Sequence, residues 1–181
     1  GDGTINSAEH AAGVTLTGTA QQGSTVTVTF GNTTLPATVA ANGSWTVDFP
    51  AGAIGTGEFT QTVTAVAVDA NGNSSTTTGT VNVDTFVNSF NYTSTAGGAD
   101  GVINAAEAQS GLIVTGHAEP GSTVQVVLGG VTSTATVAAN GDWTATYSSS
   151  QLPSGTTTTT MTATATDAAG NSSTINQTVR V

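Results

Sequence analysis

Alternating apolar and polar residues recur along the chain in short runs that end at Gly, Asn or Asp. A period of two places every second side chain on one face, which is typical of a β-strand with one buried face. The second half of the chain shows seven such runs and the first half shows six. They predict strands over residues 86–92, 112–118, 123–128, 131–138, 143–148, 157–166 and 174–181, and over residues 14–20, 25–30, 33–40, 45–50, 59–68 and 76–83. The segment 103–108 is predicted to form a helical turn.

An internal repeat organises these strands. Residues 1–83 align with residues 99–181 without a gap, and roughly half of the aligned pairs are identical. The pattern favours an all-β fold of two tandem immunoglobulin-like antiparallel sandwiches, with Trp45 and Trp143 pointing into their cores. We expect the first domain to cover residues 1–84 and the second to cover residues 85–181.

The segment 84–98 has no aligned counterpart ahead of Gly1. Its alternating Phe86, Phe90 and Tyr92 predict a strand that opens the second domain. We therefore expect the first domain to lack its own opening strand in this sequence, and the chain to be an excerpt of a longer polypeptide.

The charge balance excludes two classes of partner. The 181 residues contain one Lys or Arg against eleven Asp and Glu, for a formal net charge of −10. Nucleic-acid binding and docking on anionic membranes both need clusters of basic side chains. The chain has no Cys, which rules out disulfides and thiolate metal sites, and its apolar runs are too short to insert into a membrane.

Carboxylates are predicted to gather where the two domains join. Because successive strands alternate in direction, the turns of each sandwich collect at its two ends. The joint would then receive Asp2, Glu9, Glu58 and Asp84 from the first domain, and Asp167 and Asn171, with Glu119 and Asp142 close by, from the second. Two like charges about 4 Å apart repel by about 4 kcal/mol at an effective dielectric constant near 20, and no Lys or Arg falls there. Clustered oxygen ligands suit Ca²⁺, so the sequence predicts calcium at this joint.

The motif D-G-x-I-N-x-x-E occurs at residues 2–9 and again at residues 100–107. It combines a carboxylate, a Gly that permits a tight turn, an Asn side-chain oxygen and a Glu that can bind an ion through both oxygens. The alternative is that Asp and Asn cap turns and a short helix. The acidic and Asn positions recur while the neighbouring Thr4 and Ser7 are replaced by Val102 and Ala105, which favours the metal interpretation.

The order of several segments resembles the Ig-like extender repeats of large bacterial surface adhesins of the RTX and Bap-like kind. These segments are DGVINAAEA, TGHAEPGSTV, AANGDWT, DAAGNSS and VNVDT. The resemblance implies secreted stalk domains stiffened by Ca²⁺ in the linkers, with ligand-binding modules elsewhere. The ligands that it implies are Asp2, Asn6, Glu9, Asp84 and Asp167 at the internal joint, Asp100, Asn104 and Glu107 toward a following repeat, and Asp69 with Asn73 toward a preceding one.

We therefore expect a structural stalk module of a bacterial surface adhesin or biofilm protein. It would form an elongated, monomeric rod whose partners are the adjacent repeats of the same polypeptide. The alternative is a module that binds carbohydrate, ice or protein, which would carry an exposed aromatic or flat Thr surface in one copy only. We expect no enzyme, because no nucleophile or phosphate-loop motif occurs and because His10 and His117 align with Ala108 and Thr19.

Overall fold

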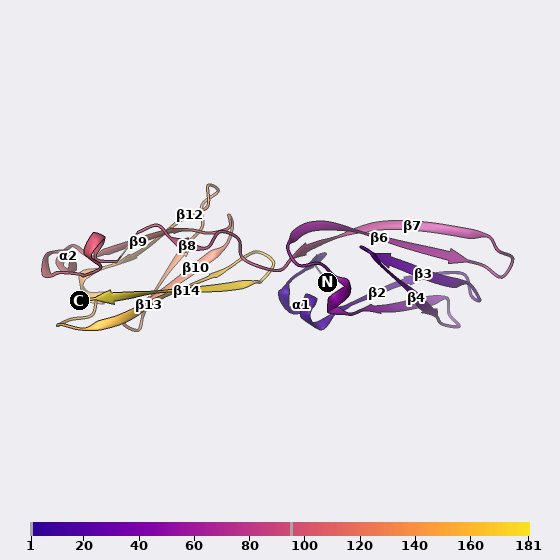
Figure 1. The fold of residues 1–181 in the computed structure, drawn as a ribbon, viewed down its shortest axis with the longest axis horizontal. Coiled ribbons are helices and arrows are strands. Elements are labelled where there is room, and N and C mark those ends of the chain that lie inside the picture. Colours follow the sequence, from indigo (N-terminus) through magenta and orange to yellow (C-terminus); the bar gives the residue numbers. More distant parts are fainter. Residues whose placement is uncertain (1, 95) are drawn as a thin grey trace. The chain divides into compact units, whose positions relative to one another are not determined.

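The computed structural model describes residues 2–94 and 96–181. The chain divides into two compact units, which are Gly1–Phe86 (unit 1) and Val87–Val181 (unit 2). Each unit is a β-sandwich, and Figure 1 shows the strands of each unit in sequence colours. Among the described residues, no helix has the length and apolar character needed to cross a membrane.

Unit 1 is built on a long antiparallel hairpin. Strands β6 and β7 pair over their full length and run side by side in Figure 1. The elements of unit 1 are β1 (Thr4–Ile5), α1 (Ser7–Ala12), β2 (Val14–Thr19), β3 (Thr25–Phe30), β4 (Thr33–Val39), β5 (Ser44–Phe49), the 3₁₀ turn η1 (Ala51–Ala53), β6 (Glu58–Val68) and β7 (Ser74–Asp84). The strand order is β1-β7-β6-β3-β4-β5-β2, because β4 pairs first with β3 and then, at Thr38 and Val39, with β5.

Unit 2 has two separate sheets. Its elements are β8 (Asn91–Tyr92), the 3₁₀ turn η2 (Gly98–Asp100), α2 (Ala105–Ser110), β9 (Leu112–His117), β10 (Thr123–Leu128), β11 (Val131–Thr136), β12 (Asp142–Tyr147), the 3₁₀ turn η3 (Ser149–Gln151), β13 (Thr158–Thr166) and β14 (Ser172–Arg180). One sheet has the order β11-β10-β13-β14 and the other has the order β12-β9-β8. Strand β8 pairs with β9 and precedes the part of unit 2 that aligns with unit 1, while the position of β1 is taken in unit 2 by a single bridge between Val102 and Arg180.

The cores follow the predicted alternation. In β10, for example, Val124, Val126 and Leu128 are fully buried while the residues between them face outward. Trp45 and Trp143 are both buried, as predicted. The all-β, immunoglobulin-like fold of each unit is therefore confirmed, because burial of one strand face every second residue is what the sequence pattern encodes.

The predicted opening strand of unit 2 was too long. The prediction covered residues 86–92, but the strand β8 contains Asn91 and Tyr92 alone. Ser89 has φ +55°, in the left-handed region, so the chain turns there and cannot stay extended. Phe86, the first apolar residue of the predicted strand, belongs to unit 1 and is 48% exposed.

Candidate metal centre

The repeated motif D-G-x-I-N-x-x-E forms the same local structure in both units. Asn6 is the N-cap of α1, where its Oδ1 accepts a hydrogen bond of 2.9 Å from the Glu9 backbone N–H, and Glu9 Oε2 accepts one of 3.2 Å from the Asn6 N–H. Asn104 and Glu107 form the equivalent reciprocal pair on α2. This capping box satisfies backbone donors that a helix leaves without partners in its first turn.

The Asp of each motif closes the turn that precedes the helix. Asp2 Oδ1 accepts from the Thr4 N–H at 2.9 Å, and Asp100 Oδ1 accepts from the Val102 N–H at 3.0 Å. The capping alternative therefore describes what these side chains do within their own units. These hydrogen bonds use part of the acceptor capacity of each side chain. That the same side chains also bind an ion stays a prediction for Asp2, Asn6, Glu9, Asp100, Asn104 and Glu107.

A second pair of equivalent sites lies in the turns that follow β6 and β13. Asp69 Oδ1 accepts from the N–H groups of Asn71 and Asn73, both at 2.8 Å, and its Oδ2 accepts from Asn73 Nδ2 at 2.8 Å. The Asn73 side-chain amide, helped by backbone N–H groups of the turn, holds the pKa of the Asp69 carboxyl below its usual value. The carboxylate is therefore ionised at neutral pH and fixed in position.

Asp167 repeats this geometry in unit 2 but is more buried. Its two oxygens accept from the N–H and the Nδ2 of Asn171, both at 2.8 Å. Asp167 is 7% exposed and Asn171 is 2% exposed, whereas the equivalent Asn73 is exposed. Burying a carboxylate costs free energy unless a cation or hydrogen bonds compensate its charge. A bound cation would therefore stabilise the Asp167 site more than the Asp69 site.

Glu119 brings a second carboxylate to the Asp167 site. A carboxylate oxygen of Glu119 and one of Asp167 lie within 4.8 Å of one another. The half-buried Glu119 also accepts, through Oε2, a hydrogen bond of 3.2 Å from the N–H of Asn88. Two carboxylates this close repel each other in the absence of a cation, and together they offer the hard oxygen ligands that Ca²⁺ prefers.

Glu119 was placed near this end of the domain by the sequence but was not among the predicted ligands. The alignment of the two repeats could have pointed to Glu119, because Glu119 aligns with Gln21 and this position is therefore acidic in one copy only. Gln21 and Asp69 line one shallow pocket in unit 1, so the same position there supplies an amide next to a single carboxylate.

In unit 1, two acids face each other across the long hairpin. Glu58 and Asp84 are direct cross-strand partners in the register of β6 and β7, and both line a small pocket with Thr4 and Asn82. Like charges directly opposite each other destabilise a sheet unless a cation lies between them. Asp84 therefore ends strand β7 opposite a second acidic residue, and its role as an ion ligand stays a prediction.

Basic side chains do not compensate these acids. Arg180 is the one Lys or Arg of the sequence, and it pairs with Thr158 at the far end of the β13–β14 hairpin from Asp167. His117 Nδ1 lies 3.2 Å from Asp142 Oδ1, and His10 Nε2 lies 3.0 Å from the Ile54 carbonyl oxygen. Among residues 2–94 and 96–181, the group that contains Glu119 and Asp167 offers carboxylates and no imidazole or thiolate, and such an oxygen-only set fits Ca²⁺.

Comparison with known families decides the classification. The family model for the bacterial Ig domain matches residues 5–84 and again residues 101–180. The chain belongs to the bacterial Ig domain family. The two matches are the two halves of the internal repeat, so the protein contains two bacterial Ig domains in tandem.

Solved structures of adhesins resemble this pair of bacterial Ig domains. One is a 1.5-MDa bacterial ice-binding adhesin, whose structure concerns retention at the host cell surface. It is 29% identical over 99% of this chain and 60% of that chain, with a TM-score of 0.52. Another is a Ca²⁺-stabilized adhesin that helps an Antarctic bacterium reach out and bind ice, which is 33% identical over 98% of this chain and 45% of that chain, with a TM-score of 0.50.

These similarities confirm the resemblance to adhesin repeats. The chain spans 60% and 45% of the lengths of the two solved chains. No curated protein matches the sequence. The established classification is therefore that of bacterial Ig-like domains similar to the extender domains of adhesins.

Proposed function

We propose that this protein is an extender module in the stalk of a secreted bacterial surface adhesin, and that Ca²⁺ bound between its two domains stiffens it. The observation that carries the proposal is the tandem match of two bacterial Ig domains in a chain that resembles Ca²⁺-stabilized and ice-binding adhesins. The chain then has a mechanical task, namely to hold a ligand-binding tip away from the cell, and no catalytic one.

In this proposal, Asp167 and Glu119 provide the unit 2 half of the calcium site. Their carboxylates lie within 4.8 Å of each other, and the Asn171 amide fixes the orientation of Asp167. Ca²⁺ takes six to eight oxygens in flexible geometry, so these two side chains leave room for further ligands. Bound Ca²⁺ would supply the positive charge that the local sequence lacks.

Asp84 is the proposed carboxylate from unit 1. Covalent geometry supports this role, since Asp84 is four residues before Asn88 and an extended chain spans at most about 3.6 Å per residue. The Asp84 and Asn88 Cα atoms are therefore within about 14 Å in any arrangement of the domains. The Asn88 N–H donates a hydrogen bond to Glu119, so the segment that follows Asp84 in the chain ends at a contact with the proposed site. Asp2, Asn6 and Glu9 remain proposed contributors from the same end of unit 1.

Calcium would stiffen the stalk by binding one interdomain arrangement better than the others. An ion that both domains coordinate shifts the population toward the arrangement in which all its ligands can reach it. Extracellular modules bind Ca²⁺ with dissociation constants on the order of 10⁻⁴ to 10⁻³ M, which matches the supply outside cells. The proposed rod would thus be flexible before export and rigid at the cell surface, where neighbouring repeats are its partners.

The equivalent acids at the outer ends extend the same scheme. Asp100, Asn104 and Glu107 would face a following repeat, and Asp69 a preceding one. A biofilm role and an RTX-type adhesin are parts of this proposal that follow from the resemblance.

Small-angle scattering with and without EDTA tests the proposal. We expect the maximum dimension to fall when Ca²⁺ is chelated and to recover when it is restored. Asp84→Asn and Asp167→Asn should each abolish the response, while Asp48→Asn, an exposed carboxylate hydrogen-bonded to Thr15 on the β2–β5 pair, should keep it. Identical scattering profiles in both conditions would contradict calcium stiffening. Binding of the unmodified pair on a glycan array or to ice would favour the recognition alternative.

A further inference from the structure

The dipeptide Asn-Gly occurs three times in the chain, each time in a turn between two strands. Asn42-Gly43 and Asn140-Gly141 are equivalent positions of the two repeats. The third pair, Asn71-Gly72, aligns with Ala169-Gly170 and so occurs in unit 1 only. Asparagine loses its side-chain amide most readily before glycine, because glycine has no side chain to shield its backbone nitrogen from the asparagine. The three turns therefore allow a comparison of the same dipeptide in three environments.

The backbone is the same in all three turns. The N–H of each glycine donates to the carbonyl oxygen three residues earlier, at 2.9 Å for Gly43 and Gly141 and at 3.0 Å for Gly72. Each glycine also has a positive φ, of +83°, +88° and +84° in the same order. These hydrogen bonds close β-turns with asparagine at the third position. A difference in reactivity must therefore come from the groups around each turn.

Side-chain hydrogen bonds hold two of the three asparagines. Asn42 Oδ1 accepts from the N–H and from the hydroxyl of Ser44, at 3.0 and 2.7 Å. Asn140 Oδ1 accepts from the Asp142 N–H at 3.1 Å, and Asn140 Nδ2 donates to Asp142 Oδ2 at 2.7 Å. The Asn71 side chain is exposed and makes no side-chain hydrogen bond within the part of the chain that the structure describes. Its amide is therefore the one of the three that can change rotamer without losing a partner.

The glycines of the same two turns are also held in place. The Gly43 carbonyl oxygen accepts from the Ala20 N–H at 2.8 Å, and the Gly141 carbonyl oxygen accepts from the Ala118 N–H at 2.9 Å. Both glycines are buried, whereas Gly72 is exposed and a Cβ built on it would meet no atom within 4 Å. The Gly72 turn joins β6 to β7 at one end of their hairpin (Figure 1). This turn can open at lower cost than the other two.

Deamidation at such a pair is a reaction within the chain. The Gly72 backbone nitrogen gives up its proton and forms a bond to Asn71 Cγ, and the Cγ–Nδ2 bond breaks, so that the side-chain nitrogen leaves as ammonia with that proton. The product is a five-membered succinimide ring. One water molecule then opens the ring. Cleavage of the bond between the ring nitrogen and Cγ gives aspartate, and cleavage at the main-chain carbonyl carbon gives isoaspartate, which has an additional methylene group in the main chain.

We propose that Asn71-Gly72 is a site of spontaneous deamidation in the folded protein, and that hydrogen bonds protect Asn42-Gly43 and Asn140-Gly141 from the same reaction. Ring closure requires rotation about the bond between Cα and the carbonyl carbon of asparagine. At Asn71 this rotation breaks the turn hydrogen bond of Gly72 alone, and the 2.8 Å bond from the Asn71 N–H to Asp69 Oδ1 can persist. At the other two pairs, the side-chain bonds and the glycine carbonyl bond oppose the same motion.

The reaction would change the turn that fixes Asp69. Aspartate at this position adds a negative charge two residues from the Asp69 carboxylate. Isoaspartate lengthens the main chain between Asn71 and Asn73, whose N–H groups both donate to Asp69 Oδ1. The pairing of β6 with β7 begins just outside the turn, at Val68 and Ser74. Isoaspartate should therefore loosen this end of the hairpin in unit 1.

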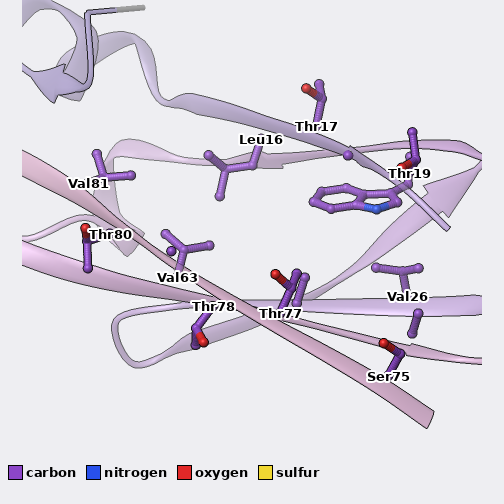
Figure 2. A pocket seen from close by; sticks show the side chains of 15 residues that line it. Leu16, Thr17, Thr19, Val26, Val63, Ser75, Thr77, Thr78, Thr80 and Val81 are labelled. Atoms are coloured by element: carbon purple, nitrogen blue, oxygen red, sulfur yellow. The ribbon is translucent and has the colours of Figure 1, made fainter.

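A groove beside β7 contains a reporter of that change. Ser75 and Thr77 of β7 line an open groove of about 590 Å³ in unit 1 (Figure 2), and the indole of Trp45 lines it as well. Ser75 pairs with Ala67 close to the turn. Movement at the start of β7 should therefore change the environment of the Trp45 indole, while Trp143 of unit 2 serves as the reference.

Ageing of the full chain in mildly alkaline buffer with EDTA tests the proposal. Peptide mapping by mass spectrometry follows the conversion of each Asn-Gly pair, and an isoaspartate-specific methyltransferase distinguishes the two products. We expect Asn71 to convert at least about tenfold faster than Asn42 or Asn140, because their side-chain and glycine carbonyl hydrogen bonds must break first. The indole N–H signal of Trp45 should change in NMR spectra as isoaspartate accumulates. In denaturant the three pairs should convert at similar rates, since the dipeptide is the same.

Two variants provide matched controls. Asn71→Ala introduces the residue that unit 2 has in the same turn, so it should fold, remove the fast conversion and keep the Trp45 signal constant during ageing. Ser44→Ala removes one of the two donors to Asn42 and should speed conversion there without affecting Asn71.

Three results would overturn the proposal. The first is conversion at Asn42 or Asn140 as fast as at Asn71 in the folded chain. The second is an intact Asn71 after a period in which the denatured chain has converted. The third is the same preference for Asn71 in denaturant, which would show that the fold does not select the site. Because EDTA is present throughout, this experiment and the scattering experiment on calcium can fail independently of each other.

Discussion

The two domains of this chain share one fold but close their cores to different extents. Trp143 lies beneath Phe90 and Tyr92, whereas Trp45 lies at the edge of an open groove. Met161 and Ala163 are fully buried in unit 2, while the aligned Val63 and Ala65 keep some exposure. The segment around β8 therefore completes the core of unit 2. The other strands of both units already bury every second side chain, as the sequence pattern predicts.

Removing the aromatic cover of unit 2 should have the largest effect. Phe90→Ala with Tyr92→Ala should destabilise unit 2 by about 3–5 kcal/mol, because each change removes buried aromatic area and leaves a cavity beside Trp143. Calorimetry combined with exchange at the β9 and β2 amides would measure each unit separately. Ile113→Ala, at a side chain that is 63% exposed in the neighbouring strand β9, is the control and should cost about 0.5 kcal/mol. Equal losses from both variants would show that β8 does not close the core.

Alkaline pH should weaken unit 2 and spare unit 1. Both tyrosines of the chain are in unit 2, where burial raises the pKa of Tyr92 and of Tyr147 to about 12. A raised pKa means that the folded state favours the neutral phenol, so this stability is complete below the unfolded pKa near 10 and is lost as pH rises toward 12. Each unit of pKa difference corresponds to about 1.4 kcal/mol.

Tyr147→Phe sharpens that comparison. The Tyr147 hydroxyl donates to the Val126 carbonyl oxygen at 2.6 Å, and unit 1 has Phe49 at the aligned position. The variant should lose about 1 kcal/mol at pH 7 and become less sensitive to alkali. Denaturant unfolding at pH 7 and pH 11 would measure both effects. Unchanged alkaline sensitivity in the variant would assign the effect to Tyr92 alone.

Calcium should act more strongly on the Asp167 site than on the Asp69 site. At 1 mM Ca²⁺ and a dissociation constant near 10⁻⁴ M, binding adds about 1.4 kcal/mol of stability. Asp167→Asn should remove the rise in melting temperature that Ca²⁺ produces, and so should Glu119→Gln. Asp69→Asn is the matched control, because Gln21 stands there in place of Glu119. Loss of the response in the Asp69 variant alone would place the ion in unit 1.

The smallest expected effect concerns the helix N-caps, which have the same structure in both domains. Asn6→Ala and Asn104→Ala should each cost about 1 kcal/mol, since both remove the side-chain acceptor of a capping box. Thermal unfolding in EDTA would measure the cost without any contribution from calcium. A markedly larger loss for either variant when Ca²⁺ is present would indicate that its Asn is also an ion ligand.

The local parts of the candidate site could be predicted from sequence. Asn6 with Glu9, and Asp69 with Asn73, lie within five residues of each other, so their spacing already indicated caps and turns. The sequence placed Glu119 close to Asp167, but it did not identify Glu119 as a ligand or predict that the two carboxylates lie within 4.8 Å of one another, because these residues come from turns separated by four strands. The prediction of an opening strand over residues 86–92 was also wrong. The alternation of apolar and polar residues carries no information about the left-handed backbone at Ser89.

The sequence by itself determined the repeat, the all-β fold, the buried tryptophans and the excess of acid over base. These properties follow from which face of each strand is apolar, and a period of two encodes that information within a few residues. The tertiary structure alone decided that carboxylate oxygens of Glu119 and Asp167 lie within 4.8 Å of one another, and that Leu16, Val63 and Trp45 line a groove of about 590 Å³ in unit 1. Both depend on which turns and edges meet when the sandwich closes, and that is a property of contacts between residues distant in the chain.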